Sequence, residues 1–104
     1  MQNGKSAVLT DATAKGYLVS GLDIQFTSAF AIEMFYTISR KSQIKSGYFK
    51  LSTNGTNYFF DDDSNQTGNT GTTLGFDGTD IYFTTDSSGD TGLINYAIRY
   101  LEML

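Results

Sequence analysis

Alternation of apolar and polar side chains is clearest in FAIEMFYTI, which spans residues 30–38. Its even-numbered positions are all large and apolar: Phe30, Ile32, Met34, Tyr36 and Ile38. Glu33 and Thr37 stand between them. Because successive side chains of a strand point to opposite faces, this period of two predicts a half-buried β-strand whose even-numbered face lies in a core.

The same pattern recurs towards both ends of the chain. Two further even-numbered apolar faces are Ile94, Tyr96, Ile98 and Tyr100, and Leu18, Leu22, Ile24 and Phe26, the latter with a bend or bulge expected at Ser20-Gly21. Shorter strands are predicted at residues 7–10, 44–53, 56–61, 72–76 and 80–85. About eight strands predict an all-β fold, an antiparallel, jelly-roll-like β-sandwich. A single helical turn at residues 11–15 is the most helix that we expect.

Turn residues separate these strands. Asn54-Gly55 and Asp77-Gly78 each predict a two-residue type I′ hairpin turn, because both central positions of that turn need a positive φ. The basic segment at residues 40–45 is predicted to connect a hairpin, with contact to an acidic partner surface as the functional alternative. The stretches that start at Tyr58 and Tyr82 each feed a polar, acidic segment, which predicts two equivalent corners at one end of the sandwich, with chance similarity as the alternative interpretation.

The chain length sets the domain organisation. With 104 residues and no linker-like segment, residues 1–104 are expected to form one domain. Residues 1–6 are polar and are expected to form a flexible N-terminal arm. The longest apolar run, at residues 30–32, is far too short for a transmembrane helix, so no membrane association is expected.

Composition excludes several classes of function. The chain has no Cys and no His, so the Ser-His and Cys-His nucleophile pairs and imidazole metal sites cannot form. A net charge of −4, with only 7 basic residues spread along the chain, argues against nucleic-acid binding. Nothing in the sequence places a pair of carboxylates in a cleft, as a glycosidase would need. We therefore expect a protein without enzymatic activity and without a cofactor.

Three consecutive carboxylates, Asp61, Asp62 and Asp63, form the sharpest acidic feature. Calcium favours oxygen-rich loops, so these residues are a weak calcium candidate. The spacing is not that of an EF-hand, because Gln66 stands where Gly is needed and Thr72 where the bidentate Glu belongs. The favoured interpretation is a solvated strand end that discourages edge-to-edge pairing, with no metal bound.

Aromatic residues make up 14% of the chain, and most occupy core positions of the predicted strands. Phe35, Tyr58 and Tyr82 fall opposite the expected inward positions, which makes them the surface-binding candidates. Sugars stack on such flat rings, so a glycan site is one interpretation. A subunit interface is the favoured one, since interfaces are enriched in Tyr and Phe.

The order of strands and turns from about residue 20 to residue 104 resembles a β-sandwich domain of tailed-bacteriophage virion proteins. The segments that carry this resemblance are Tyr36-Thr37-Ile38-Ser39-Arg40, Ser46-Gly47-Tyr48-Phe49-Lys50-Leu51, Asn54-Gly55-Thr56, Asp61-Asp62-Asp63, the stretch at 67–74, Ile81-Tyr82-Phe83-Thr84-Thr85, Thr91-Gly92 and Tyr96-Ala97-Ile98-Arg99-Tyr100. Such domains occur in capsid decoration proteins and in head-fibre or tail-fibre appendages.

This resemblance implies a structural protein of the virion, with other virion proteins as partners and self-association, commonly into homotrimers. It supplies no catalytic residue. In fibres the domain usually follows a long shaft, and this chain has none before it, which favours a capsid decoration or head-appendage protein. The alternatives are a receptor- or glycan-binding tip domain of a tail fibre and a free lectin-like carbohydrate-binding module.

Overall fold

The computed structural model describes residues 5–18, 30–54, 56–76 and 81–102. Within these ranges the chain forms eight strands: β1 (Lys5–Leu9), β2 (Gly16–Tyr17), β3 (Phe30–Arg40), β4 (Gln43–Thr53), β5 (Tyr58–Gln66), β6 (Thr72–Phe76), β7 (Ile81–Thr85) and β8 (Gly92–Glu102). The described ranges contain no helix, and hence none that could cross a membrane. The predicted all-β class and strand number are confirmed.

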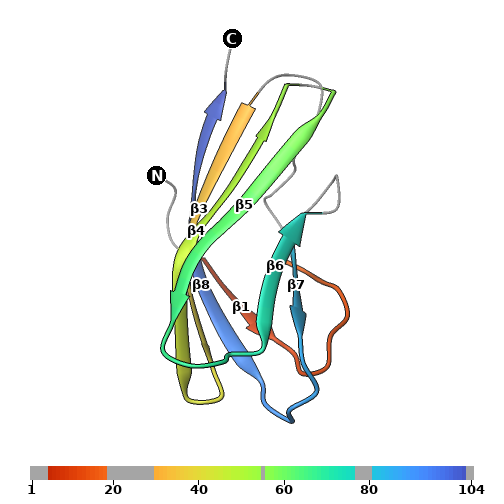
Figure 1. The fold of residues 1–104 in the computed structure, drawn as a ribbon, viewed down its shortest axis with the longest axis vertical. Coiled ribbons are helices and arrows are strands. Elements are labelled where there is room, and N and C mark those ends of the chain that lie inside the picture. Colours follow the sequence, from red (N-terminus) through yellow and green to blue (C-terminus); the bar gives the residue numbers. More distant parts are fainter. Residues whose placement is uncertain (1–4, 19–29, 55, 77–80, 103–104) are drawn as a thin grey trace.

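The strands form two antiparallel sheets (Figure 1). The larger sheet has five strands in the order β1-β8-β3-β4-β5, and the smaller has three in the order β2-β7-β6. β1 pairs with β8 and β2 with β7, so the first strands of the chain lie beside its last ones, as in a jelly roll. In Figure 1 the long strands of the larger sheet extend well beyond the smaller one, which covers only their lower part.

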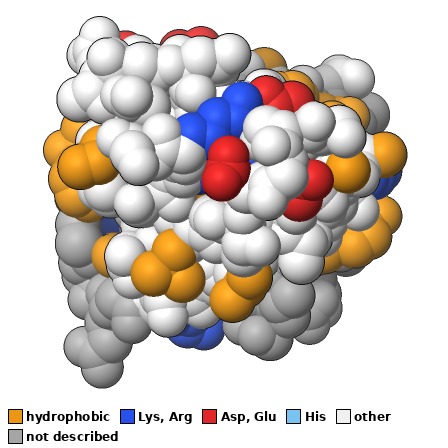
Figure 2. Space-filling model, turned by 90° about the horizontal axis from the view of Figure 1, so that it is seen from below, with side chains coloured by type: hydrophobic (Ala, Val, Ile, Leu, Met, Phe, Trp, Pro, Cys, Tyr) orange, Lys and Arg blue, Asp and Glu red, His pale blue; other side chains and the backbone are white. Residues whose placement is uncertain are grey.

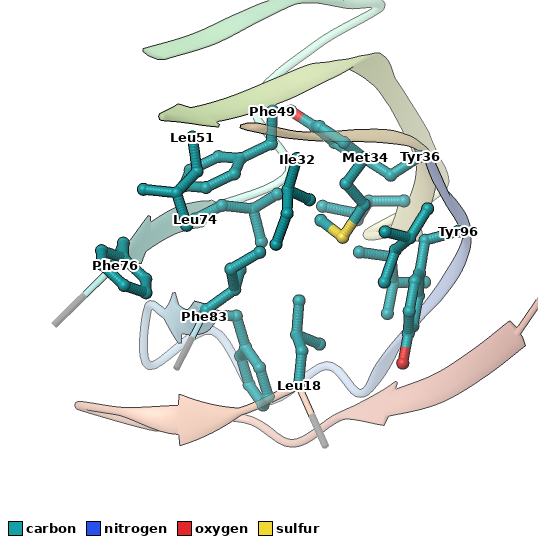
Figure 3. Packing of buried hydrophobic residues seen from close by; sticks show 14 of the residues in the cluster. Leu18, Ile32, Met34, Tyr36, Phe49, Leu51, Leu74, Phe76, Phe83 and Tyr96 are labelled. Carbon is teal, nitrogen blue, oxygen red and sulfur yellow. The ribbon is translucent and has the colours of Figure 1, made fainter. Parts of the chain in front are cut away.

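The core lies between the sheets and follows the predicted alternation. On β3 the side chains of Ile32, Met34, Tyr36 and Ile38 are buried, and on β8 those of Ile94, Tyr96 and Ile98. Leu74, Phe76 and Phe83 of the smaller sheet and Leu18 complete this core from the other side (Figure 3). Ile81 of β7 is buried in the same core. Burial of these apolar surfaces is the main favourable term in folding. Leu22, Ile24, Phe26 and the predicted bend at Ser20-Gly21 lie outside the described residues.

The β4–β5 hairpin forms, but without the predicted two-residue turn. β4 and β5 pair from Thr53↔Tyr58 onwards, so four residues connect them. The side chain of Asn54 shapes this loop, since its Oδ1 accepts hydrogen bonds from the backbone N–H of Thr56 and of Asn57. β5 then runs on to Gln66, so the acidic segment expected beyond a strand end is itself strand. An Asx side chain that captures nearby N–H groups favours the longer loop.

The other local predictions have mixed outcomes. Lys41 and Ser42 connect β3 to β4 with φ of 58° and 59°, the left-handed conformation of a type I′ turn, so the predicted hairpin at 40–45 is confirmed. β6 and β7 pair through Phe76↔Ile81, while Asp77-Gly78 lies outside the described residues. No helical turn forms at 11–15. Within the predicted arm, Lys5 and Ser6 instead belong to β1 and pair with Tyr96 and Asn95.

Candidate functional site

The larger sheet turns one face to the core and leaves the other uncovered by the smaller sheet, and we call the latter the outer face. Among the described residues nine large apolar side chains are exposed, and six of them lie on this face: Val8, Phe35, Ile44, Tyr48, Phe59 and Leu93. Phe35 and Tyr48 are cross-strand partners with ring centroids 5.0 Å apart. Protein interfaces are enriched in such aromatic residues, so this pair marks the outer face as a candidate interaction surface.

A row of alternating charge crosses the outer face. Arg99 of β8 pairs in register with Glu33 of β3, Glu33 with Lys50 of β4, and Lys50 with Asp61 of β5. The signs therefore run plus, minus, plus, minus over four adjacent strands. None of the four makes an ion pair or hydrogen bond with another side chain that the structure describes. Their charged ends are available to a ligand or partner.

A hollow of about 320 Å³ lies along this row. It is lined by Ala31, Ile32, Glu33, Lys50, Ser52 and Arg99. Ala31 and Ser52 are opposite each other on β3 and β4, and their small side chains leave the space that the longer charged side chains border. The hollow thus offers a carboxylate, two cations and a hydroxyl group close to one another.

The three predicted surface aromatics do not gather at one place. Phe35, 43% exposed, lies on the outer face. Tyr58, 44% exposed, lies on the opposite side of β5, where its ring meets that of Phe76 edge-on at 4.9 Å. The prediction that Tyr58 points away from the core side is therefore wrong. Its side chain is exposed because β5 is an edge strand of the larger sheet. Tyr82 is half-buried on the smaller sheet, where it pairs with Tyr17 and lies under the Lys15 ammonium.

The carboxylates of Asp61, Asp62 and Asp63 also diverge. They are consecutive in β5, so Asp62 points to one face and its two neighbours to the other. Asp62 accepts a hydrogen bond of 2.6 Å from the Tyr36 hydroxyl and lies 3.8 Å from the Lys45 ammonium. No group of three or more metal-ligating side chains gathers within the described ranges. Burial and the Asp62 hydrogen bond raise the pKa of Tyr36.

A buried arginine organises the end of the sandwich where β3 turns into β4. The Arg40 side chain is 0% exposed. Its Nη1 donates to the Thr70 carbonyl at 2.9 Å and to Asp86 Oδ1 at 2.7 Å, and its Nη2 donates to Asp11 Oδ1 at 2.7 Å. The remaining bonds from Nε, Nη1 and Nη2 reach the Asp90, Gly71 and Asp86 carbonyls and the Ser88 hydroxyl. We call Arg40 with Asp11, Asp86 and Ser88 the Arg40 cluster.

The Arg40 cluster holds together three connections: those that follow β1, β5 and β7. Asp11 Oδ1 also accepts the backbone N–H groups of Ser88 and Gly89, and the Asp86 N–H donates to the Gly71 carbonyl. The two corners therefore lie at one end as predicted, but they are not equivalent, because residues 61–66 belong to β5 whereas Asp86 and Asp90 lie in the β7–β8 connection. Figure 2 views this end of the molecule and shows basic and acidic side chains adjacent at its centre. Because the acceptors around Arg40 belong to the chain itself, the cluster joins these loops to one another, and loss of one member would leave a buried charge without its partner.

The cationic groups of Lys41 and Arg40 change the pKa of the Asp86 carboxyl. Hydrogen bonds from Lys41 and Arg40 lower the pKa of its carboxyl from 3.8 to about 2. A carboxyl whose pKa is depressed by folding contributes stability above its unfolded pKa, and this contribution is lost as the pH falls through the folded pKa. The contribution of Asp86 should thus disappear between about pH 4 and pH 2.

We expect Asp86→Asn to flatten the dependence of stability on pH between pH 4 and pH 2. Urea unfolding at pH 2, 3, 4 and 6 measures this dependence. Asp90→Asn is the matched control, because the Asp90 carboxylate makes no hydrogen bond to a described residue and only its carbonyl reaches Arg40. An unchanged slope in Asp86→Asn would show that the Lys41 and Arg40 contacts do not bear on acid stability.

Two of these features escaped the sequence prediction although both had a signal. Arg40 continues the even-numbered, inward series of β3, so the alternation that buries Ile38 also predicts a buried position two residues later. The buried position was not predicted because a charged guanidinium is normally found at the surface. The charge row follows from a hairpin centred on Lys41-Ser42, since that turn places Glu33 opposite Lys50.

Comparisons with known proteins identify no relative of this chain. No family model matches the chain, and neither a curated protein nor a solved structure is significantly similar to it.

Proposed function

We propose that this chain is a non-enzymatic structural protein of a bacteriophage particle, a capsid decoration or head-appendage protein. In this role it binds the capsid surface and associates with copies of itself. The outer face of the larger sheet serves the self-association.

The exposed apolar side chains of the outer face carry this proposal. Six of them lie on a surface of regular strands, where a partner can approach closely. Protein interfaces are enriched in aromatic residues, and Phe35, Tyr48 and Phe59 supply three here. Phe59 is 66% exposed, so contact with a partner would remove a large part of its ring from water.

The phage particle itself rests on the resemblance in the order of strands and turns between about residues 20 and 104. The composition agrees with it. A chain without Cys or His lacks the common nucleophilic and imidazole chemistry, and a net charge of −4 keeps crowded copies soluble.

Labelling of particles from the source with a gold-tagged antibody against this chain tests the proposal. We expect the label over the head, in many copies per particle. Label confined to the tail or its fibres would instead support a receptor-binding tip. Particles without any label would overturn the virion assignment and favour the free binding module.

The hollow on the outer face favours glycan binding as a second candidate function. Ligand pockets have volumes of about 300–1,000 Å³, so this hollow lies at the small end of the range. Glu33, Lys50 and Arg99 can donate or accept hydrogen bonds to sugar hydroxyls, and the Phe35 ring lies beside them, in the next row of β3. A binding tip would use these groups on a host-surface glycan.

If the hollow binds a glycan, the purified chain should bind members of an array of neutral and acidic oligosaccharides. Arg99→Ala and Glu33→Gln should then each weaken binding by at least about tenfold, since one charge-assisted hydrogen bond is worth about 1.5–3 kcal/mol. Lys15→Ala is the control, because Lys15 lies over Tyr17 and Tyr82 on the smaller sheet. An array without any signal would exclude this function.

A further inference from the structure

The charge row of the outer face, Arg99, Glu33, Lys50 and Asp61, has a symmetry that selects a partner. The row reads plus, minus, plus, minus, and the same row read in the reverse direction is minus, plus, minus, plus. A reversed second copy therefore places an opposite charge against each of the four. We propose that a second copy of this chain packs on the outer face, related by a two-fold axis that runs parallel to the strands between β3 and β4. This inference rests on the self-association in the proposed function and does not depend on the kind of particle.

The register of the sheet determines which side chains then meet. The axis reverses the order of the strands and leaves each row at its own height. Glu33 therefore faces Lys50 of the second copy, and Arg99 faces Asp61 of the second copy. Each of these contacts occurs twice because the interface is isologous. Four opposite-charge pairs thus form from side chains that have no partner side chain within the described part of one copy.

The other two-fold arrangement of the same faces is excluded by charge. An axis that runs across the strands, along the row, would place Glu33 against Glu33 and Lys50 against Lys50 of the second copy. Like charges brought together at an interface cost several kcal/mol. The row therefore disfavours an axis that runs along it, and it fixes where the parallel axis lies across the strands, between β3 and β4.

Apolar contacts reinforce the favoured packing. The next row of the outer face holds Phe35 and Tyr48 side by side, so reversal places Phe35 on Tyr48 of the second copy. Further along the strands, the same reversal places Ile44 on the small side chain of Ser39 of the second copy. The hollow beside the charge row leaves room for the long side chains of Lys50 and Arg99 from both copies. Aligned packing of two sheets, about 30° apart, permits such an arrangement.

The size of the face indicates a weak dimer. Four strands spaced about 4.8 Å apart, with about nine residues each, span roughly 600 Å² per copy. Stable interfaces bury about 800 Å² per partner, so this one lies towards the small end. We expect a dissociation constant in the micromolar range. The two-fold geometry also distinguishes this arrangement from the homotrimer that the phage resemblance implies, since a face-to-face contact accommodates two copies only.

Charge reversal and mixing test the proposal. Sedimentation equilibrium of the purified chain from about 1 to 300 μM should fit a monomer–dimer equilibrium. Glu33→Lys alone and Lys50→Glu alone should each weaken the dimer at least tenfold, because each places two like-charge pairs at the interface. An equimolar mixture of the two variants should restore dimers to within about threefold of the original affinity. In the mixed dimer both contacts between positions 33 and 50 again join opposite charges: one keeps its original signs, and the other has both signs exchanged.

The mixing experiment distinguishes repulsion between copies from repulsion within one copy. In each variant the repulsion between β3 and β4 of the same chain persists after mixing, so only a contact between copies can be restored. Lys15→Glu, the same charge change near the smaller sheet, should leave the dimer unchanged. A chain that stays monomeric, a trimer, or a dimer that mixing fails to restore would each overturn the proposal. None of these results bears on where antibody labels a particle, so the virion assignment is tested separately.

Discussion

Replacing Arg40 with Lys should lower the free energy of unfolding by about 3 kcal/mol. The ammonium of Lys keeps the charge but presents its donors at a single point. It cannot reach the Thr70 carbonyl, Asp11 and Asp90 together, as the planar guanidinium does. The buried Thr70 carbonyl then loses its donor, which costs about 1–3 kcal/mol, while the partly exposed Asp11 and Asp86 carboxylates lose charge-assisted hydrogen bonds. Urea denaturation monitored by circular dichroism measures the change.

Arg99, the only other arginine of the chain, provides the matched control. It is exposed on the outer face, and Arg99→Lys preserves the sign of the charge row. We expect Arg99→Lys to alter stability by less than about 0.5 kcal/mol. Equal effects of the same substitution at both positions would contradict the role assigned to the Arg40 cluster.

Gly71→Ala should produce the second-largest loss of stability. Gly71 has a φ of 62°, which an Ala side chain disfavours, and an added Cβ would meet the Asp86 carboxylate. The Asp86 carboxylate would have to leave its position beside Arg40. Two further hydrogen bonds would be disturbed: the one that the Gly71 carbonyl accepts from the Asp86 N–H, and the one that the Gly71 N–H donates to Asn69. The substitution thus strains the backbone and displaces a member of the Arg40 cluster.

Gly89→Ala separates these two effects. Gly89 also has a positive φ, 89°, but nothing lies within 4 Å of an added Cβ. We expect this variant to lose about 1 kcal/mol, the backbone contribution alone, and Gly71→Ala to lose at least twice as much. Urea denaturation of both variants gives the comparison. Equal losses would mean that Asp86 moves aside without cost.

Local pattern predicted the strands better than the segments between them. β3 and β8 could be recognised because large apolar residues occupy every second position, and this alternation depends only on which side of a strand faces the core. Thr72–Phe76 was predicted with its observed bounds, since turn residues flank it on both sides. The extent of β5 could not be predicted from its composition. Asp61, Asp62 and Asp63 have low strand propensity, and pairing with β4 overrides it.

The candidate site was less predictable than the fold because it depends on neighbours far apart in sequence. Phe35 could be assigned to a surface from alternation alone. Its position between Ala97 and Tyr48 depends on how β8, β3 and β4 align, and the charge row depends on the same alignment. Arg40 required knowledge of the connections at 67–71 and 86–91, which supply most of its acceptors. A single sequence contains no direct signal for such distant partners.

The pairing of β1 with β8 and of β2 with β7 has a consequence for the newly made chain on the ribosome. β1 ends at Leu9, and its partner strand starts at Gly92. At a synthesis rate of about 5–20 residues per second, several seconds pass after β1 and β3 are made before β8, which pairs with both, is synthesised. During that interval unpaired strand edges and apolar side chains are exposed to other nascent chains. The acidic residues of β5 lie on the opposite edge strand of the larger sheet, where like charges disfavour pairing with the same edge of another chain.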